Sequence, residues 1–226
     1  MDAVVPTIEE LLALPAAETY KSDARSSVWR VDSPRGSYVL KRYEYAPLRQ
    51  RLGQWLGLHP GQRERRGVRR LQRAGIEAAE LERWAVRRGK YVQAMEHGGD
   101  CLQDLLNDAA WEAQATREAI LRNLATTTAK LLAAGLVHRD LKVGNVLVDD
   151  ATRVVLIDVG AVRPSRSTRR RRATLGILFH TLGKASRTPA DAARDRKTLA
   201  QWFLAHGVAR QLLPRDAVEA VDSEHE

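Results

Sequence analysis

The sequence predicts a mixed α+β protein that is rich in strands in its N-terminal part and mainly helical in its C-terminal part. Between residues 20 and 95, runs of β-branched and aromatic residues are separated by turn residues, which is typical of strands. From residue 111 onward, apolar residues recur at the spacing of one helix face. With 226 residues, the chain is long enough to bury a real core as one large or two small domains.

The first predicted elements are a short helix and a hairpin. Thr7 and Glu10 form a capping-box pattern for a helix that ends before Pro15. Residues 20–31 and 37–43 are predicted strands, and the Asp-Ser-Pro-Arg-Gly sequence between them is typical of a turn. The two strands are therefore expected to pair as a hairpin.

A longer helix is predicted from Pro60 to Gly75, since proline suits a first helical turn and glycine a C-terminal cap. When this helix is wound at about 100° per residue, Glu64 falls on its apolar stripe. The opposite stripe is basic, and it is either a solvated face or a surface that meets phosphates. Its members are Arg66, Arg69, Arg70 and Arg73.

A carboxylate on a buried helix face needs a cation, and we expect Lys41 to be that cation. Lys41 shares a strand face with Val39, so it would emerge from an apolar wall. The alternative for Lys41 is an ordinary solvated strand lysine. Glu77 and Glu80 lie beyond the helix and are rival partners for the lysine.

The remaining elements follow from the same patterns. Strands are predicted for residues 81–88 and 89–95, and helices for residues 101–107, 111–134 and 173–182. The helix 111–134 should bury Ile120, Leu121, Leu124, Thr128, Leu131 and Leu132. Thr188 and Pro189 open what we expect to be the last helix, and the acidic tail of residues 219–226 is expected to be frayed.

The most informative stretch is residues 137–148, Val-His-Arg-Asp-Leu-Lys-Val-Gly-Asn-Val-Leu-Val, followed by Leu-Ile-Asp-Val-Gly at 156–160. Phosphoryl transfer needs an acid that orients the attacking hydroxyl, oxygen ligands for Mg²⁺, and cations on the transferring phosphate. These groups are supplied, in order, by Asp140, Lys142, Asn145 and Asp158. The strands after Asn145 and before Asp158 should set these two residues side by side at one end of a hairpin. The alternative is a solvated turn, but a chance turn has no reason to reproduce the whole set.

This stretch resembles the catalytic loop, H-R-D-L-K-x-x-N, and the D-F-G triplet of the protein-kinase-like superfamily. One departure is Val159, which stands where the family has Phe. The resemblance implies a two-lobed protein-kinase-like fold, with a small antiparallel β-sheet lobe that carries one helix and a mainly α-helical large lobe. Residues 1–96 would form the nucleotide-binding lobe and residues 97–226 the catalytic lobe.

The resemblance also implies ATP and Mg²⁺ as cofactors and a role for each matching residue. In that reading Asp140 and Lys142 are catalytic, Asn145 and Asp158 bind the metal, and Lys41, Glu64, Glu96 and Asp100 serve the nucleotide. Glu96 lies in the run that would offer backbone groups to adenine. Asp100 would accept a hydrogen bond from the ribose, or it is simply the N-cap of the next helix. Residues 21–27 would cover the phosphates, but they contain no glycine and also fit a plain loop.

A narrower resemblance, over about residues 20–182, is to the bacterial lipopolysaccharide kinase family. It rests on Tyr-Val-Leu-Lys-Arg-Tyr at 38–43, Glu-Arg-Arg at 64–66, Leu-Gln-Arg-Ala-Gly-Ile at 71–76 and Gly-Leu-Val-His-Arg-Asp-Leu at 135–141. The family implies an anionic sugar-lipid acceptor, a Kdo or heptose, at the inner face of the inner membrane. Lys142 departs from it, since a lysine there is more typical of protein serine/threonine kinases.

The charge composition of the chain indicates which kinds of partner it binds. The net charge of +9 and the pI near 10.1 favour a polyanionic partner, and residues 163–172 alone hold six arginines. A solvated helix start is a poor explanation for this run, because cations oppose a helix N-terminus. We expect it to hold the chain on an anionic membrane surface. The single Cys101 and the absence of a long apolar run predict a cytoplasmic location, either free or peripheral on the inner membrane.

Three functions remain open on the sequence. The first is a kinase that acts on a lipopolysaccharide core sugar or another small hydroxyl acceptor. The second is a compact protein serine/threonine kinase, which Lys142 favours and the lack of an Ala-Pro-Glu triplet disfavours. The third is a pseudokinase or nucleic-acid-binding module. We do not expect nucleic acid as a partner, because a binding module has no need for all four catalytic residue types.

Overall fold

The fold is taken from a computed structural model, and it confirms the predicted mixed α+β class. Contacts divide the chain into a first unit, residues 1–68 with 79–97, and a second unit, residues 69–78 with 98–226. The boundary that we expect between a nucleotide-binding lobe, residues 1–96, and a catalytic lobe, residues 97–226, stays a prediction. The structure describes residues 6–44, 48, 52–53, 55–56, 58–79, 81–87, 90–108 and 114–223.

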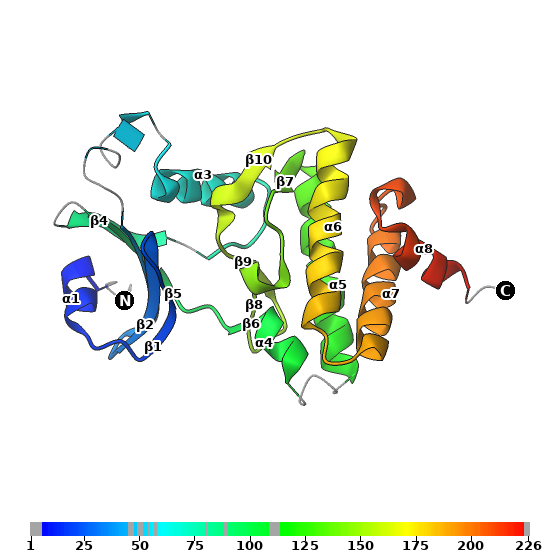
Figure 1. The fold of residues 1–226 in the computed structure, drawn as a ribbon, viewed down its shortest axis with the longest axis horizontal. Coiled ribbons are helices and arrows are strands. Elements are labelled where there is room, and N and C mark those ends of the chain that lie inside the picture. The colour runs from blue at the N-terminus through cyan, green and yellow to red at the C-terminus, as the bar shows by residue number, and fades with distance from the viewer. Residues whose placement is uncertain are drawn as a thin grey trace. The chain divides into compact units, whose positions relative to one another are not determined.

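The first unit is built on a five-stranded sheet with the order β1-β2-β3-β5-β4 and antiparallel neighbours throughout (Figure 1). Its strands are β1 (Glu18–Ser22), β2 (Ser26–Ser33), β3 (Gly36–Tyr43), β4 (Leu81–Arg87) and β5 (Lys90–Glu96). The junction between the strands predicted for residues 81–88 and 89–95 lies outside the described residues, because Arg88 and Gly89 are not among them.

The single strand predicted over residues 20–31 is wrong, because the chain reverses within it. Asp23 accepts the backbone N–H groups of Arg25 and Ser26 on Oδ1, both at 2.8 Å. This side-chain turn separates β1 from β2, which then pair with each other. The glycine-free stretch 21–27 therefore comprises the end of β1, the turn at residues 23–25 and the start of β2.

One face of the sheet is covered by helix α1 (Ile8–Ala13), whose predicted capping box between Thr7 and Glu10 is confirmed. Alternation along β3 sends even-numbered side chains to this face and odd-numbered ones to the other. The core on the α1 side consists of Ile8, Leu11, Val31, Tyr38, Leu40, Val92 and Ala94.

Helix α3 (Pro60–Arg73) has the predicted limits, and Gly75 follows it with φ +64°. Its apolar stripe is buried as predicted: Leu71 is fully buried, and Val68 and Glu64 nearly so. Residues 69–78, which include the last turn of the helix, belong to the second unit.

The second unit is mainly helical, with short strands at its loops (Figure 1). Its helices are α4 (Leu102–Asn107), α5 (Gln114–Ala133), α6 (Thr168–Ala185), α7 (Pro189–Ala205) and α8 (Arg215–Asp222). The strands β6 (Asp100–Cys101), β8 (Val146–Val148) and β9 (Val154–Leu156) form one sheet, and β7 (Leu136–His138) pairs with β10 (Val162–Pro164).

Helix α5 packs against α7, and α7 packs against α6 and α8. All six side chains predicted to be buried on α5 are buried, and none of them is more than 4% exposed. The predicted start of this helix at Trp111 lies outside the described residues. Within the part of the chain that the structure describes, every helix is too short or too polar to cross a membrane.

Three expectations about the second unit are wrong. Asp100 is not a helix N-cap, because it lies in β6 opposite Val148 and the N-cap of α4 is Cys101. The helix at Thr188 is not the last, since α8 follows it. The acidic tail is helical as far as Asp222, while residues 224–226 lie outside the described part.

The arginine run is also a helix start, against expectation. Helix α6 begins at Thr168, so residues 169–172 form its first turns. Arg171 donates to the carbonyl of Leu132 at 2.9 Å, and Arg172 donates to the carbonyl of Gln211 at 2.8 and 3.0 Å. These bonds draw two of the four guanidinium groups to carbonyl acceptors, which offsets the unfavourable charge at this helix end.

Candidate active site

The loop after β7 gathers three of the predicted residues. The Asn145 side-chain amide donates to the backbone carbonyl of Asp140 at 2.8 Å and to its Oδ2 at 3.3 Å. Lys142 Nζ lies 3.4 Å from the same Oδ2. A short 3₁₀ turn, Val143–Asn145, returns the chain to this point. The Asp140 carboxylate is thus presented between an amide and an ammonium group, about half-exposed to solvent.

His138 supports this loop from beneath. Its side chain is fully buried, and its Nδ1 accepts the backbone N–H of Asp140 at 3.2 Å. Burial lowers the pKa of His138, although the nearby Asp158 carboxylate opposes this shift. The neutral ring can accept a hydrogen bond, whereas a protonated ring cannot. The sequence placed this histidine in the motif but gave it no role, and its position two residues before Asp140 is the available signal.

The predicted hairpin of β8 and β9 is confirmed, and it fixes the other end of the site. The backbone N–H of Ile157 donates to the carbonyl of Asn145 at 3.0 Å. Asn145 and Asp158 therefore lie at the same end of the hairpin, as expected. Asp158 has a left-handed backbone, with φ 51° and ψ 38°. Aspartate tolerates this region better than most residues, and such strain concentrates at functional positions.

The donor set of Asn145 and Asp158 fits Mg²⁺. Both residues offer oxygen, and the Asn145 nitrogen already bonds to Asp140, so the amide oxygen is its ligand atom. Mg²⁺ is held in such sites by one or two protein ligands together with phosphate oxygens and water. Among the described residues no group of three or more His, Cys, Asp or Glu side chains could hold a metal alone. The pair therefore suits a metal that arrives with a phosphate ligand.

The predicted ion pair in the first unit is present. Lys41 Nζ lies 3.5 Å from Glu64 Oε2, and the two side chains are 16% and 3% exposed. Glu64 has a second partner that the sequence did not indicate, because Tyr43 donates its hydroxyl to the same oxygen at 2.9 Å. Tyr43 follows Lys41 by two residues on β3, so it shares its face. Of the rival acids, Glu77 lies 3.9 Å from Arg153, and Glu80 lies outside the described residues.

An aromatic cluster holds the start of α3 beside this pair. The ring of His59 lies 5.6 Å from that of Tyr43 and 4.6 Å from that of Tyr91. A Cβ atom on Gly61 would lie 2.1 Å from the Tyr91 ring, so only glycine fits there. Burial raises the pKa of Tyr91 to about 12. The cluster sets the first turn of α3, and hence Glu64, against β3.

Arg70 leaves the predicted arginine stripe and serves the second unit. Its guanidinium donates to the carbonyl of Val162 at 2.8 Å, and Arg163 donates to the same carbonyl at 2.7 Å. Val162 follows the 3₁₀ turn Val159–Ala161 that leads away from Asp158. Arg70 thus fixes the chain just after the predicted metal ligand. Its partner is 92 residues away, which a helical wheel cannot indicate.

The two remaining predicted residues lie on either side of the division between the units. Glu96 ends β5 opposite Tyr38 in the first unit, and its side chain is exposed. Asp100 is exposed in β6 of the second unit. Gly99 precedes it with φ +119°, and a Cβ there would lie 2.2 Å from the carbonyl oxygen of Val148. The nucleotide roles of Glu96 and Asp100 stay predictions.

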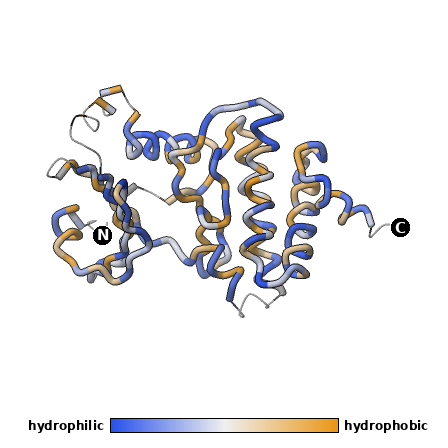
Figure 2. Tube along the Cα trace, viewed as in Figure 1, coloured by the Kyte–Doolittle hydropathy of each residue, from blue (hydrophilic) through white to orange (hydrophobic). Residues whose placement is uncertain are grey.

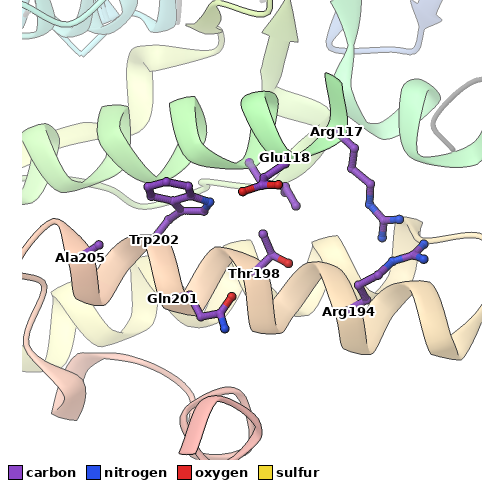
Figure 3. Close-up of a pocket in the computed structure, with 8 residues that line it drawn as sticks. Arg117, Glu118, Arg194, Thr198, Gln201, Trp202 and Ala205 are labelled. Atoms are coloured by element: carbon purple, nitrogen blue, oxygen red, sulfur yellow. The ribbon is translucent and has the colours of Figure 1, made fainter. Parts of the chain in front are cut away.

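A groove of about 340 Å³ lies between α5 and α7, away from these residues (Figure 3). Arg117 and Arg194 point toward each other at one end of it, and Trp202 lies at the other. Arg117 is bound to the buried Asp195 and Arg194 to Asp191. Because both cations are neutralised by acids, the groove is not a strong anion site. A second groove, of about 660 Å³, is lined by residues of α6, α8 and the turn between α7 and α8.

Comparisons with known proteins agree with this chemistry. The model of a family described as the phosphotransferase enzyme family, within the protein-kinase-like superfamily, matches residues 52–165. The matched range contains α3 and the whole loop and hairpin from His138 to Asp158. No protein in a collection of curated sequences matches the chain.

Proposed function

This chain belongs to the phosphotransferase enzyme family, and from that premise we propose that it transfers the γ-phosphoryl group of ATP to a hydroxyl of an anionic sugar-lipid. The acceptor we propose is a Kdo or heptose residue of a lipopolysaccharide core, met at the inner membrane surface. The observation that carries the proposal is the group formed by Asp140, Lys142 and Asn145. Its contacts of 2.8 to 3.4 Å present one carboxylate beside one ammonium, as in-line transfer to a hydroxyl requires.

In the proposed reaction the acceptor hydroxyl oxygen attacks the γ-phosphorus while the bond to the β,γ-bridging oxygen breaks, and ADP leaves. Asp140 orients the hydroxyl and takes its proton, which is why this carboxylate must remain ionised and accessible. Lys142 places positive charge beside it for the transferring phosphate. Lys41, which Glu64 holds in place, would bind the α and β phosphates.

Mg²⁺, when bound, neutralises charge on the phosphates, and Asn145 and Asp158 are the residues that would hold it. The fit of this oxygen-donor pair supports the assignment. Glu96 and Asp100 are proposed to serve the adenine and the ribose, and both side chains are exposed at the ends of their strands.

Charge supports an anionic acceptor. The chain has a net charge of +9, and Arg166, Arg169, Arg170 and Arg172 are exposed around the start of α6. Each such residue near an anionic leaflet is worth about 1 kcal/mol. This surface would concentrate the enzyme at a membrane that carries phosphorylated and carboxylated sugars.

Two alternatives each have an observation in their favour. Lys142, which contacts Asp140, is typical of protein serine/threonine kinases and supports a protein acceptor. A pseudokinase is favoured by the β1–β2 turn, where a side-chain hydrogen bond from Lys21 and two backbone N–H groups lower the pKa of Asp23 to about 2. A charged acid in the turn that would cover phosphates opposes nucleotide binding.

Radiolabelled ATP separates these functions. We expect label on a Kdo- or heptose-bearing precursor. Label on protein would indicate a protein kinase instead, and no transfer of label would indicate a pseudokinase. Asp140→Asn should lower the transfer rate by about 10²–10⁴-fold while leaving nucleotide affinity nearly unchanged. The matched control is Asp150→Asn, an exposed acid in the β8–β9 turn, which should keep full activity. Equal activity of the two variants would refute the assignment of Asp140.

A further inference from the structure

The segment between β3 and α3 exposes an unusual amount of apolar surface. Its described leucine and tryptophan side chains are all exposed: Leu48 at 80%, Leu52 at 53%, Trp55 at 82%, Leu56 at 51% and Leu58 at 61%. We call these five residues the 48–58 patch; Figure 2 colours short pieces of this segment orange, for hydrophobic residues. Elsewhere in the described part of the chain, large exposed apolar side chains occur singly, at Leu12, Tyr20 and Val86. Scattered exposure is ordinary, whereas a concentrated patch marks an interaction surface.

The backbone gives the patch a helical form where it is described. The N–H of Leu56 donates to the carbonyl of Leu52 at 2.9 Å, and the N–H of Leu58 donates to that of Gly53 at 2.7 Å. The second bond closes the turn in the manner of a helix C-terminal cap. Positions 48, 52, 55 and 56 have the spacing of one helix face. Local hydrogen bonds therefore order the backbone at Leu56 and Leu58, whose side chains are exposed.

Charge identifies the partner of the patch. Residues 45–63 contain three arginines and no acidic residue, and Arg63 and Arg66 at the start of α3 are exposed. A second copy of this chain would bring two basic surfaces together, which is unfavourable. An anionic lipid leaflet complements the charge and accepts the apolar side chains at the same time. Leucine and tryptophan next to arginine are also the composition of helices that lie in a membrane interface.

We propose that the 48–58 patch inserts into the interfacial region of an anionic lipid bilayer, while Arg63 and Arg66 contact the headgroups. Trp55 and Leu48, the two most exposed side chains, supply the deepest contacts. The patch belongs to the first unit, and the proposal does not rest on the transfer reaction or its acceptor. It differs from attraction by arginines alone, because the apolar side chains add a part of the affinity that salt does not screen.

Vesicle co-sedimentation of the full chain tests this. We use vesicles of phosphatidylcholine alone and of phosphatidylcholine with phosphatidylglycerol, at low and at high salt. The chain should bind the anionic vesicles at low salt and keep part of this binding at high salt. Trp55→Glu should lower the partition coefficient between water and the anionic vesicles about tenfold to hundredfold. The reason is that the glutamate side chain stays in water, whereas the tryptophan side chain would transfer to the membrane interface.

The matched control is Tyr20→Glu, which adds the same charge to an exposed aromatic residue of the same unit, 47% exposed on β1. This variant should bind vesicles within about twofold of the unaltered chain. Asp140→Asn should bind them equally well, which keeps failure of this proposal distinct from failure of the proposed function. Equal losses for Trp55→Glu and Tyr20→Glu would overturn the proposal, as would no binding of the unaltered chain. A dimer in solution that Trp55→Glu dissociates, without vesicle binding, would assign the patch to a second copy instead.

Discussion

Replacing Glu64 by glutamine tests the ion pair on which nucleotide binding is proposed to depend. At the observed 3.5 Å between Lys41 Nζ and Glu64 Oε2, the gross attraction is about 5 kcal/mol for an effective dielectric constant near 20. Much of this offsets the dehydration of Glu64, which is 3% exposed. Lys41 is 16% exposed, so its ammonium still reaches some water after the change. We therefore expect Glu64→Gln to lower the free energy of unfolding by about 2 kcal/mol.

Two further variants separate the contribution of the Tyr43 hydrogen bond from that of the Lys41 ion pair. Glutamine keeps an oxygen for the Tyr43 hydroxyl, whereas Glu64→Ala removes it and should cost about 1.5 kcal/mol more. Tyr43→Phe alone should cost a similar 1.5 kcal/mol, since it deletes a hydrogen bond to a carboxylate. Glu18→Gln is the matched control, because its contact with Arg30 is 3.7 Å long and half-exposed. Surface pairs of this kind contribute less than about 1 kcal/mol.

Urea denaturation measures the stabilities, and fluorescence titration with a labelled nucleotide measures affinity. Glu64→Gln should weaken nucleotide binding about tenfold, because Lys41 is no longer held in one position. Glu18→Gln should leave the affinity unchanged. If Glu64→Gln and Glu18→Gln lose equal stability, the pair contributes nothing specific. If the affinity of Glu64→Gln is unchanged, Lys41 does not depend on Glu64 for its function.

Three other predictions address the scaffold. Asp195→Ala should cost about 3–5 kcal/mol in urea denaturation, because it leaves the buried Arg117 without its main acceptor; a loss below 1 kcal/mol would contradict a buried pair. The hydrogen bond from Lys21 helps to hold the pKa of Asp23 at about 2, below its usual 3.8. The ionised Asp23 carboxylate therefore stabilises the folded state above about pH 4, and this stabilisation is lost toward pH 2. Asp23→Asn keeps an acceptor but should flatten the acid dependence of the thermal midpoint over that range, and an unchanged slope would exclude this carboxylate. Gly99→Ala should cost about 3 kcal/mol, measured by thermal unfolding, because of its φ of +119° and the carbonyl oxygen 2.2 Å from the new Cβ; unchanged stability would mean that the chain there relaxes freely.

The sequence was a good guide where a local pattern decides the outcome. Proline, glycine and a 3.6-residue period set the limits of α3 and the burial of Glu64. Spacing within one loop and one hairpin was enough to place Asp140, Asn145 and Asp158. In each case the partners lie within about twenty residues of one another, so short-range rules apply.

Prediction from the sequence failed where a side chain bonds to a partner that short-range sequence rules do not include. Asp23 bonds to two backbone N–H groups and breaks a run that reads as one strand. Charge rules disfavoured a helix start in residues 169–172, but Arg171 and Arg172 reach carbonyl groups 39 residues away. Arg70 likewise leaves its stripe for Val162. These interactions are set by tertiary packing, which overrides local preference.

The turn after β9 shows how a chemical position is kept while its packing differs from the related pattern. Val159 stands where that pattern has an aromatic ring, and it is 2% exposed, so a smaller side chain fills a core position. The turn is held instead by its backbone: the N–H of Val162 donates to the carbonyl of Val159, and the Val162 carbonyl accepts from Arg70 and Arg163. These bonds fix the segment that follows the left-handed Asp158, whose carboxylate we propose as a Mg²⁺ ligand. A sequence pattern that requires an aromatic residue at position 159 would judge this site to be lost. The hydrogen bonds to the Val159 and Val162 carbonyls show instead that the backbone, and not an aromatic ring, holds the turn that presents the Asp158 carboxylate.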